Sequence, residues 1–415
     1  MSSWSRAIVW SLIAAAFIGP GTVTAAARAG SEGGWRYLPF VCLAAFAGFL
    51  LMEMAARLTL VSGQTLGQIL GTRQRWLAIF CFVAVLLGCV AYQAGNLVGA
   101  FGGLQLVFGL ERWWVLILGG VAGIVLWPGE TKWIARALAG VVILMALVFM
   151  VAAVQLLLGG AAFSGNNTVA TGTVIGLVGT TIVPYNFFLA AGLSKGQQLG
   201  DMRNGLLLSF VVGGIITLCI VLVGSVATSF SNFADLARTL DAVLGNWSKV
   251  VLGIGLFAAG FSSAVTAPLA AAIAGRELLV RDPEERSVVK QPWFRMIWGG
   301  VLAIGLLVAL LKIDIVTVIL AAQVANGLML PLIAAIVLVF ANDRALLGDK
   351  VNAHWQNVAG WLVASFLAFK NAGLLLGKIN LPNEVLGYVL GILYLLGVGW
   401  LILNRRSERE APVKY

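Results

Sequence analysis

The stretch FIGPGTVTAAARAG, residues 17–30, lies inside the first apolar segment of the chain and contains residues that interrupt a helix. Gly19, Pro20 and Gly21 fall near the middle of that segment. Proline has no backbone N–H and its ring clashes with the preceding turn, so a helix breaks there. In a membrane such a break is tolerated only where it is buried in protein or lines a cavity. The stretch therefore predicts a functional break near the centre of a transmembrane helix.

The composition is that of a polytopic membrane protein. Of the 415 residues, 60% are hydrophobic and 11% are charged, and the mean hydropathy is +0.97. A bilayer is crossed by roughly 20 apolar residues. Stretches of about this length lie at 7–28, 36–60, 76–98, 113–129, 133–158, 169–192, 205–229, 249–275, 293–311, 314–341, 357–377 and 384–403. We therefore expect an all-α protein with twelve spans.

The net charge of +10 reflects membrane orientation. Lys and Arg gather in the loops that share a side with both termini, such as 276–295 and 405–414. The positive-inside rule then predicts a multi-pass protein of the cell (plasma) membrane with both termini cytoplasmic. The spans contain no histidine, no paired carboxylates and no phosphate-binding loop, so we expect no enzyme activity and no cofactor. The expected partners are the lipid bilayer and a small solute, with no nucleic acid and with a monomer favoured.

A second break sits at an equivalent place later in the chain. Pro184 interrupts the sixth apolar stretch, and a small polar side chain follows two residues later, Thr22 after Pro20 and Asn186 after Pro184. Transporters are often built from inverted repeats whose interrupted helices meet at the bilayer midplane. This spacing predicts a first repeat over 1–160 and an inverted second repeat over 165–341. Residues 342–415 then supply spans 11 and 12 and a cytoplasmic tail.

These residues resemble the Nramp family of divalent-metal transporters, which have the leucine-transporter (LeuT) fold. The resemblance covers nearly the whole chain. It rests on 255–266 (GLFAAGFSSAVT), on Gln323 through Pro331 with the following 342–348 (NDRALLG), and on 97–109. The fold it implies has two inverted five-helix repeats plus two C-terminal helices. It also implies that the two broken helices hold the transported solute.

The metal-binding motifs of the family are altered in this chain. The family's aspartate, proline, glycine and asparagine of the first broken helix read Gly19-Pro20-Gly21-Thr22, and its methionine, proline and histidine of the sixth read Val183-Pro184-Tyr185. The resemblance places a metal-binding carbonyl at Thr180 and keeps the glutamine of the tenth helix as Gln323. The expected substrate-binding residues are Gly19, Gly21, Thr22, Thr180, Val183, Tyr185, Asn186 and Gln323, and a bound cation would use Thr22, Thr180 and Gln323.

Two substrates remain open at this point. Softer transition metals favour a thioether ligand, and a carboxylate offsets the desolvation of a divalent ion. This site offers neutral oxygens, which suit a hard or hydrated divalent cation such as Mg²⁺ or Mn²⁺. The alternative is a small uncharged or zwitterionic metabolite. We expect a secondary transporter or facilitator that works by alternating access.

Coupling to protons is expected to differ from that of the family. The titratable positions on the family's third helix correspond here to Gln93 and Asn96, so we expect no Nramp-type proton coupling. Glu53 is either a proton carrier or vestibule group or the partner of Arg57 one turn away. Hydroxyls at Ser262, Ser263 and Thr266 either form a sodium site with the first helix or serve close helix packing.

Overall fold

The computed structural model describes residues 18–127, 132–160, 169–188, 197–227, 230–280 and 292–377. The predicted stretch 384–403 and the beginning of 7–28 lie outside these ranges. The helices in chain order are α2 (Pro20–Gly33), η1 (Gly34–Tyr37), α3 (Leu38–Ser62), α4 (Leu66–Arg73), α5 (Arg75–Phe108), α6 (Trp114–Leu126), α7 (Lys132–Leu158), α8 (Thr171–Thr181), α10 (Leu199–Ser225), α11 (Phe233–Leu244), η2 (Gly245–Trp247), α12 (Ser248–Leu279), α14 (Pro292–Leu310), α15 (Ile315–Ala341), α16 (Arg344–Leu347), η3 (Gly348–Lys350) and α17 (His354–Gly377).

Within the described ranges, seven helical segments are long and apolar enough to cross a membrane. They are Pro20–Ser62, Arg75–Phe108, Gly140–Leu158, Leu199–Ser225, Gly245–Leu279, Pro292–Leu310 and Ile315–Ala341. These helices confirm the all-helical, multi-pass membrane architecture predicted from hydropathy. The apolar stretch 113–129 forms the shorter α6, of 13 residues.

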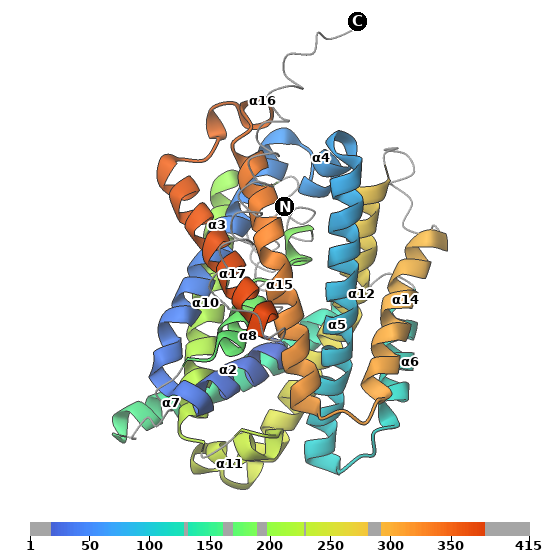
Figure 1. Ribbon diagram of the computed structural model, residues 1–415. Helices are drawn as coiled ribbons and strands as arrows, with labels where there is room; N and C mark the ends of the chain where they lie inside the picture. The colour runs from blue at the N-terminus through green and yellow to red at the C-terminus, as the bar shows by residue number, and fades with distance from the viewer. Residues whose placement is uncertain are drawn as a thin grey trace, which may run out of the picture.

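Helix α11 was not predicted, because its 12 residues alternate apolar and polar faces and do not form an apolar run. Its first turn is closed by a capping box. The Asn232 side chain accepts from the backbone N–H of Asp235, and the Asp235 carboxylate accepts from the N–H of Asn232. Such reciprocal caps satisfy the free N–H groups at a helix start. This surface helix lies at one end of the bundle, opposite α4 and α16 (Figure 1).

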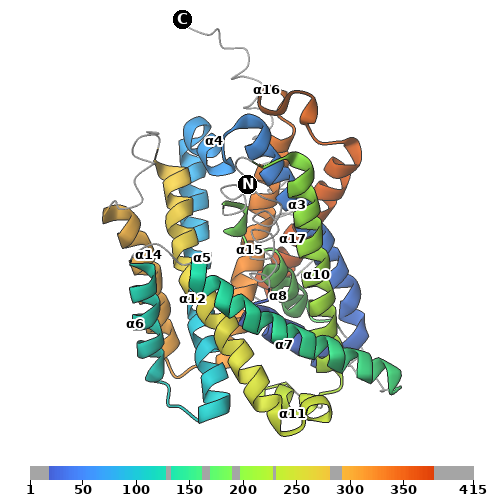
Figure 2. The same cartoon turned by 180° about the vertical axis from the view of Figure 1, so that it is seen from behind.

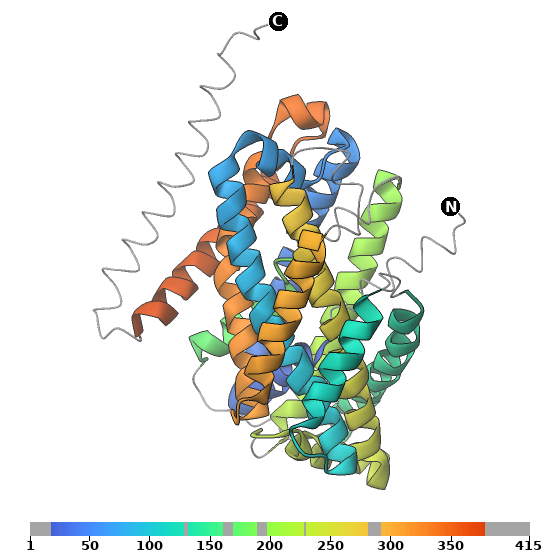
Figure 3. The same ribbon diagram turned by 90° about the vertical axis from the view of Figure 1, so that its right-hand side faces the viewer.

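The short helices α2 and α8 lie in the interior, and longer helices surround them (Figure 1). Helices α5 and α12 run side by side for most of their length, with α6 and α14 outside them. Helix α7 crosses the back of the bundle obliquely (Figure 2). Helix α17 packs on α15 at the periphery (Figure 3). The two interrupted elements are thus enclosed by protein on several sides.

Glycine allows α2 and α10 to approach at backbone distance. A Cβ atom on Gly30 would lie 2.2 Å from the Val221 carbonyl oxygen, and one on Gly224 would lie 2.6 Å from the Ala27 carbonyl oxygen. Both neighbours are backbone atoms, which cannot rotate away. Lipid tails are apolar, so the hydrophobic effect does not drive helices together inside a membrane. Small residues at such crossings let the helices pack closely enough to associate.

This contact predicts a stability difference between two glycine-to-alanine variants. Gly224→Ala should lower the free energy of unfolding by about 1–3 kcal/mol, because overpacking forces the two backbones apart. The matched control is Gly299→Ala on α14, where a Cβ would have no atom within 4 Å. That variant should stay within about 1 kcal/mol of wild type, since alanine favours a helix. Thermal unfolding in detergent measures both, and equal melting temperatures for the two variants would contradict the packing argument.

Candidate functional site

Helix α2 begins at the predicted break. Gly19 is extended (φ −98°, ψ 175°) and Pro20 occupies the first helical position. The backbone N–H groups of Thr22 and Val23 both donate to the Gly19 carbonyl, at 3.0 and 3.2 Å. Proline suits this position because its missing N–H would have no helical partner there. On its α2 side the break ends earlier than expected, because Gly21 and Thr22 already belong to the first turn of α2.

Helix α8 ends just before the second proline. It runs to Thr181, and Ile182 is extended (φ −116°, ψ 90°). A turn follows in which the Asn186 N–H donates to the Val183 carbonyl at 3.0 Å. The predicted unwound stretch therefore begins at Ile182, and Thr180 is still helical. Val183 and Tyr185 are buried, and Asn186 is partly exposed.

The two interrupted helices meet through their threonines. The Thr22 and Thr180 hydroxyls lie 2.9 Å apart in a hydrogen bond. Both residues are buried, at 2% and 1% exposure. The N-terminal end of α2 carries partial positive charge and the C-terminal end of α8 carries partial negative charge. Both a partial positive and a partial negative charge therefore meet at this point, and they come from helix ends and not from charged side chains.

Gln323 of α15 completes this group. A Cβ atom on Gly21 would lie 2.2 Å from Gln323 Nε2, so the amide rests directly on the first turn of α2. The backbone of α15 also approaches α8, because a Cβ on Gly179 would lie 2.0 Å from the Gln323 carbonyl oxygen. Gln323 Oε1 is buried and has no hydrogen-bond partner among the described residues. An acceptor is thus left unused beside the two threonines.

Tyr92 of α5 belongs to the same region and was not predicted. Its ring lies edge-on to Tyr185, with 5.7 Å between the ring centroids and 68° between the planes. A Cβ atom on Gly19 would lie 3.5 Å from the Tyr92 hydroxyl oxygen and 3.7 Å from Ser263 Oγ. In the sequence, only the position next to Gln93 distinguishes Tyr92. Aromatic residues are common in membrane helices, so this position alone does not predict a role at the site.

Gln93 points toward the neighbouring helices α12 and α14, and Asn96 lies almost one turn further along α5. Gln93 Nε2 donates to the Ala264 carbonyl of α12 at 3.0 Å, and its side chain packs where α14 has Gly305. Both residues are buried, at 0% and 2% exposure. Gln93 Oε1 and Asn96 Nδ2 have no partner among the described residues. The Gln93 amide therefore connects α5 to α12.

The three predicted α12 hydroxyls have different neighbours. Ser263 is the one that faces Gly19. Ser262 donates to the Ala259 carbonyl at 3.1 Å and Thr266 to the Ser263 carbonyl at 3.4 Å, both within their own helix. This arrangement favours helix packing over a shared ion site for Ser262 and Thr266.

Glu53 lies in an ion network away from the threonines. Its Oε1 is 3.2 Å from Arg57 Nε and 2.8 Å from Arg203 Nε. Arg57 also donates to the Lys350 carbonyl and to Asn352 Oδ1. Glu53 and Arg57 are each 2% exposed. The carboxylate therefore fastens α3 to α10, and through Arg57 to the segment after α15.

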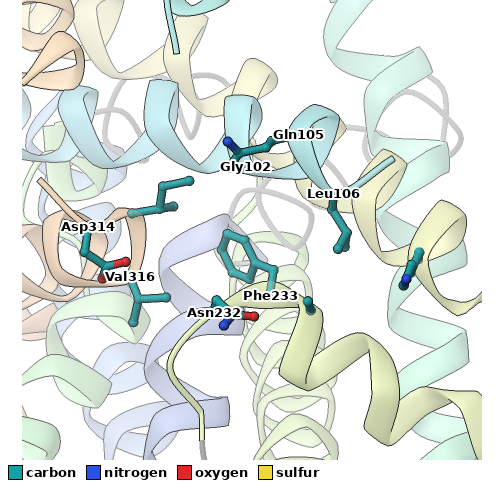
Figure 4. A pocket seen from close by; sticks show the side chains of 10 residues that line it. Gly102, Gln105, Leu106, Asn232, Phe233, Asp314 and Val316 are labelled. Carbon is teal, nitrogen blue, oxygen red and sulfur yellow. The ribbon is translucent and has the colours of Figure 1, made fainter. Parts of the chain in front are cut away.

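A pocket of about 420 Å³ opens near α11, between α5, α12 and α15 (Figure 4). The Phe233 ring projects from α11 into it and packs on Gly102 of α5. Asp314 and Lys249 contribute opposite charges to its lining. Burial lowers the pKa of the nearby Arg112 guanidinium, and the Asp314 carboxylate opposes that shift. The pocket is therefore not a purely acidic trap for cations.

A much smaller cavity of about 10 Å³ adjoins the threonines, lined by Thr22, Thr181, Phe210, Gly213, Gly214 and Thr217. This volume is about the minimum that holds one water molecule. No group of three or more His, Cys, Asp or Glu side chains suited to a metal occurs in the described ranges. The polar groups at the helix breaks are thus neutral hydroxyls, amides and backbone atoms.

The sequence and the fold were compared with known proteins. A protein-family model described as natural resistance-associated macrophage protein-like (Nramp) matches residues 11–377. A relative from Klebsiella pneumoniae strain 342, named divalent metal cation transporter MntH, is 24% identical over 387 residues, which cover 88% of this chain and 92% of the relative.

Solved structures share the fold. A mutant of the Eremococcus coleocola manganese transporter superposes with a TM-score of 0.72 at 18% identity, over 97% of this chain and 94% of that one. The nucleobase-cation-symport-1 family transporter Mhp1 superposes with a TM-score of 0.58 at 13% identity, over 96% and 93%. The predicted leucine-transporter fold is confirmed. The chain belongs to the Nramp family, a family of membrane transporters and not of enzymes.

Proposed function

We propose that this protein moves a divalent metal cation across the plasma membrane by alternating access, and that the cation binds where α2, α8 and α15 meet. The observation that carries the proposal is the Thr22–Thr180 hydrogen bond beside the unpaired Gln323 Oε1. Three helices contribute neutral oxygens there, and two of them are interrupted at that depth. The relatives named as divalent metal cation and manganese transporters favour a metal over an organic metabolite.

The neutral oxygens favour a cation that keeps much of its water. Taking a divalent ion fully out of water is expensive unless charged groups compensate. Hydroxyl and amide oxygens are hard ligands, and Mg²⁺ in particular dehydrates reluctantly and retains waters when bound. We therefore propose that Mg²⁺ and Mn²⁺ bind in partly hydrated form, with Thr22, Thr180 and Gln323 contacting the ion or its waters. Gly19, Gly21, Val183, Tyr185 and Asn186 would shape the surrounding surface.

The architecture supports a moving pair of repeats. We propose that residues 1–160 and 165–341 are the two repeats and that 342–415 is an addition to them. With both termini cytoplasmic, the pocket beneath α11 faces outward and serves as the vestibule through which the ion arrives. The Glu53 network would then fasten the cytoplasmic end. The protein would act as a monomer, because each chain contains both broken helices.

Removing single oxygens should weaken transport. Thr22→Ala and Gln323→Ala should each raise the KM for Mn²⁺ uptake about 3- to 30-fold, corresponding to about 0.7–2 kcal/mol for one lost hydrogen bond or ligand. The matched control is Thr59→Ala on α3, a buried threonine whose hydroxyl donates to the Ala55 carbonyl at 3.2 Å. Uptake into proteoliposomes measures all three. A wild-type protein that neither binds nor moves Mn²⁺ or Mg²⁺ at millimolar concentration would refute the metal assignment.

Restoring a carboxylate at the first break should increase affinity. A side chain fits at Gly19, where a Cβ would make only ordinary contacts, whereas one at Gly21 would displace the Gln323 amide. Gly19→Asp should therefore lower the KM for Mn²⁺ about tenfold, because one nearby charge contributes on the order of 1 kcal/mol even when well screened. Gly21→Ala should raise the KM. Concentration-dependent uptake distinguishes the two, and a folded Gly19→Asp variant with wild-type KM would place the ion elsewhere.

Proton coupling should be absent. Gln93 and Asn96 are buried amides that cannot release a proton, and the described residues that line the small cavity at Thr22 include no carboxylate or histidine. Mn²⁺ uptake should therefore proceed without acidifying the vesicle lumen, and an inward pH gradient should change its rate less than twofold. A pH-sensitive dye inside the vesicles measures this. Lumen acidification in step with Mn²⁺ uptake would show a proton route through other residues.

A further inference from the structure

Asn326 is a buried amide that the proposed site does not use. It lies on α15 three residues beyond Gln323 and is 0% exposed. Neither its Oδ1 nor its Nδ2 has a hydrogen-bond partner among the described residues. Buried polar side chains are almost always paired with protein or ordered water. A side chain with both amide groups unpaired in the described part of the chain therefore points to an occupant such as water or a bound solute.

Helix α5 approaches this amide closely through a glycine. A Cβ atom on Gly88 would lie 3.2 Å from Asn326 Oδ1 and 3.1 Å from Met329 Sδ, so Asn326 faces α5 where that helix has no side chain. Gln323 precedes it by almost one turn, and residues three apart share a helix face. Two carboxamides with unused oxygens therefore follow one another along α15 at a spacing of about 4.5 Å.

A neighbouring asparagine, on α17, makes a hydrogen bond that serves helix packing. Asn371 of α17 donates from Nδ2 to the Gly327 carbonyl at 3.0 Å and so fastens α17 to α15. Asn326 makes no such bond to any described helix. Its amide is therefore not explained by helix association.

We propose that Asn326 is a second station for the hydrated cation, reached after Gln323 on the way to the cytoplasmic end of α15. This inference rests on the proposed function. The Oδ1 atom would accept hydrogen bonds from the cation's waters or bind the ion directly, and the Nδ2 group would donate to an outer water. Two neutral stations in series let an ion advance without full dehydration, and each binds weakly enough to release it.

Transport by the full-length protein in proteoliposomes tests this station. Asn326→Leu should raise the KM for Mn²⁺ at least fivefold while its melting temperature stays equal or rises, because an apolar group replaces an unpaired polar one. Asn326→Asp should lower the KM about tenfold. The matched control Asn371→Leu should lower the melting temperature and change KM less than twofold. Wild-type KM in both Asn326 variants would overturn the station even if wild type moves metal.

Thiol labelling tests the station independently of transport. In Asn326→Cys, a water-soluble thiol reagent should modify the new cysteine, and Mn²⁺ should slow that reaction at least fivefold. Ala334→Cys, on the buried apolar part of α15, should not react, and wild type supplies the background of the four native cysteines. An unreactive Asn326→Cys would overturn the station. Reaction without Mn²⁺ protection while wild type transports Mn²⁺ would also overturn it, whereas lack of wild-type transport would refute the proposed function.

Discussion

The hydrogen bond between Thr22 and Thr180 holds together two helices that are both interrupted inside the membrane region. A lipid environment offers no partners for free backbone groups, so interrupted helices must lie against protein. Here the start of α2 lies against the end of α8, and α15 closes the contact through Gln323 on Gly21. A side chain at Gly179 would collide with the Gln323 backbone carbonyl, and one at Gly21 would displace the Gln323 amide. The central geometry therefore depends on small residues as much as on polar ones.

The charged side chains and the neutral polar side chains lie in different parts of the bundle. The centre contains hydroxyls and amides, whereas the ion pairs lie toward the ends of the helices. Glu53 joins Arg57 and Arg203 at one end, and Asp314 lies near Arg112 at the other. Under the proposed function, a neutral centre would keep binding weak and reversible, and the charged ends would hold elements that separate when access alternates. The neutral groups at the centre and the ion pairs toward the helix ends lie at different depths in the bundle, so the two roles do not interfere with each other.

Much of the fold was predictable because apolar length and the two prolines are strong signals. Pro20 and Pro184 marked both breaks: α2 begins at Pro20 itself, whereas α8 already ends at Thr181, three residues before Pro184. Helix α11 was missed because an amphipathic surface helix has no apolar run. Tyr92 and Asn326 were missed for another reason: their importance depends on which side chains face them across α5 and α15, and no linear pattern contains that information.

The Gln93 amide of α5 shows how the fold would be kept in a transporter without the proposed proton coupling. Gln93 keeps a bond to the Ala264 carbonyl, so it connects α5 to α12 while offering no proton. A titratable side chain in the same place would change charge during transport and would need a compensating partner in a dry interior. An amide has nearly the same shape as a carboxyl group but stays neutral, so it avoids that cost. Under the proposed function, the scaffold can therefore retain its packing around a central site that has no carboxylate, because without a charge at that site α5 needs no titratable group to balance it when the cation has left.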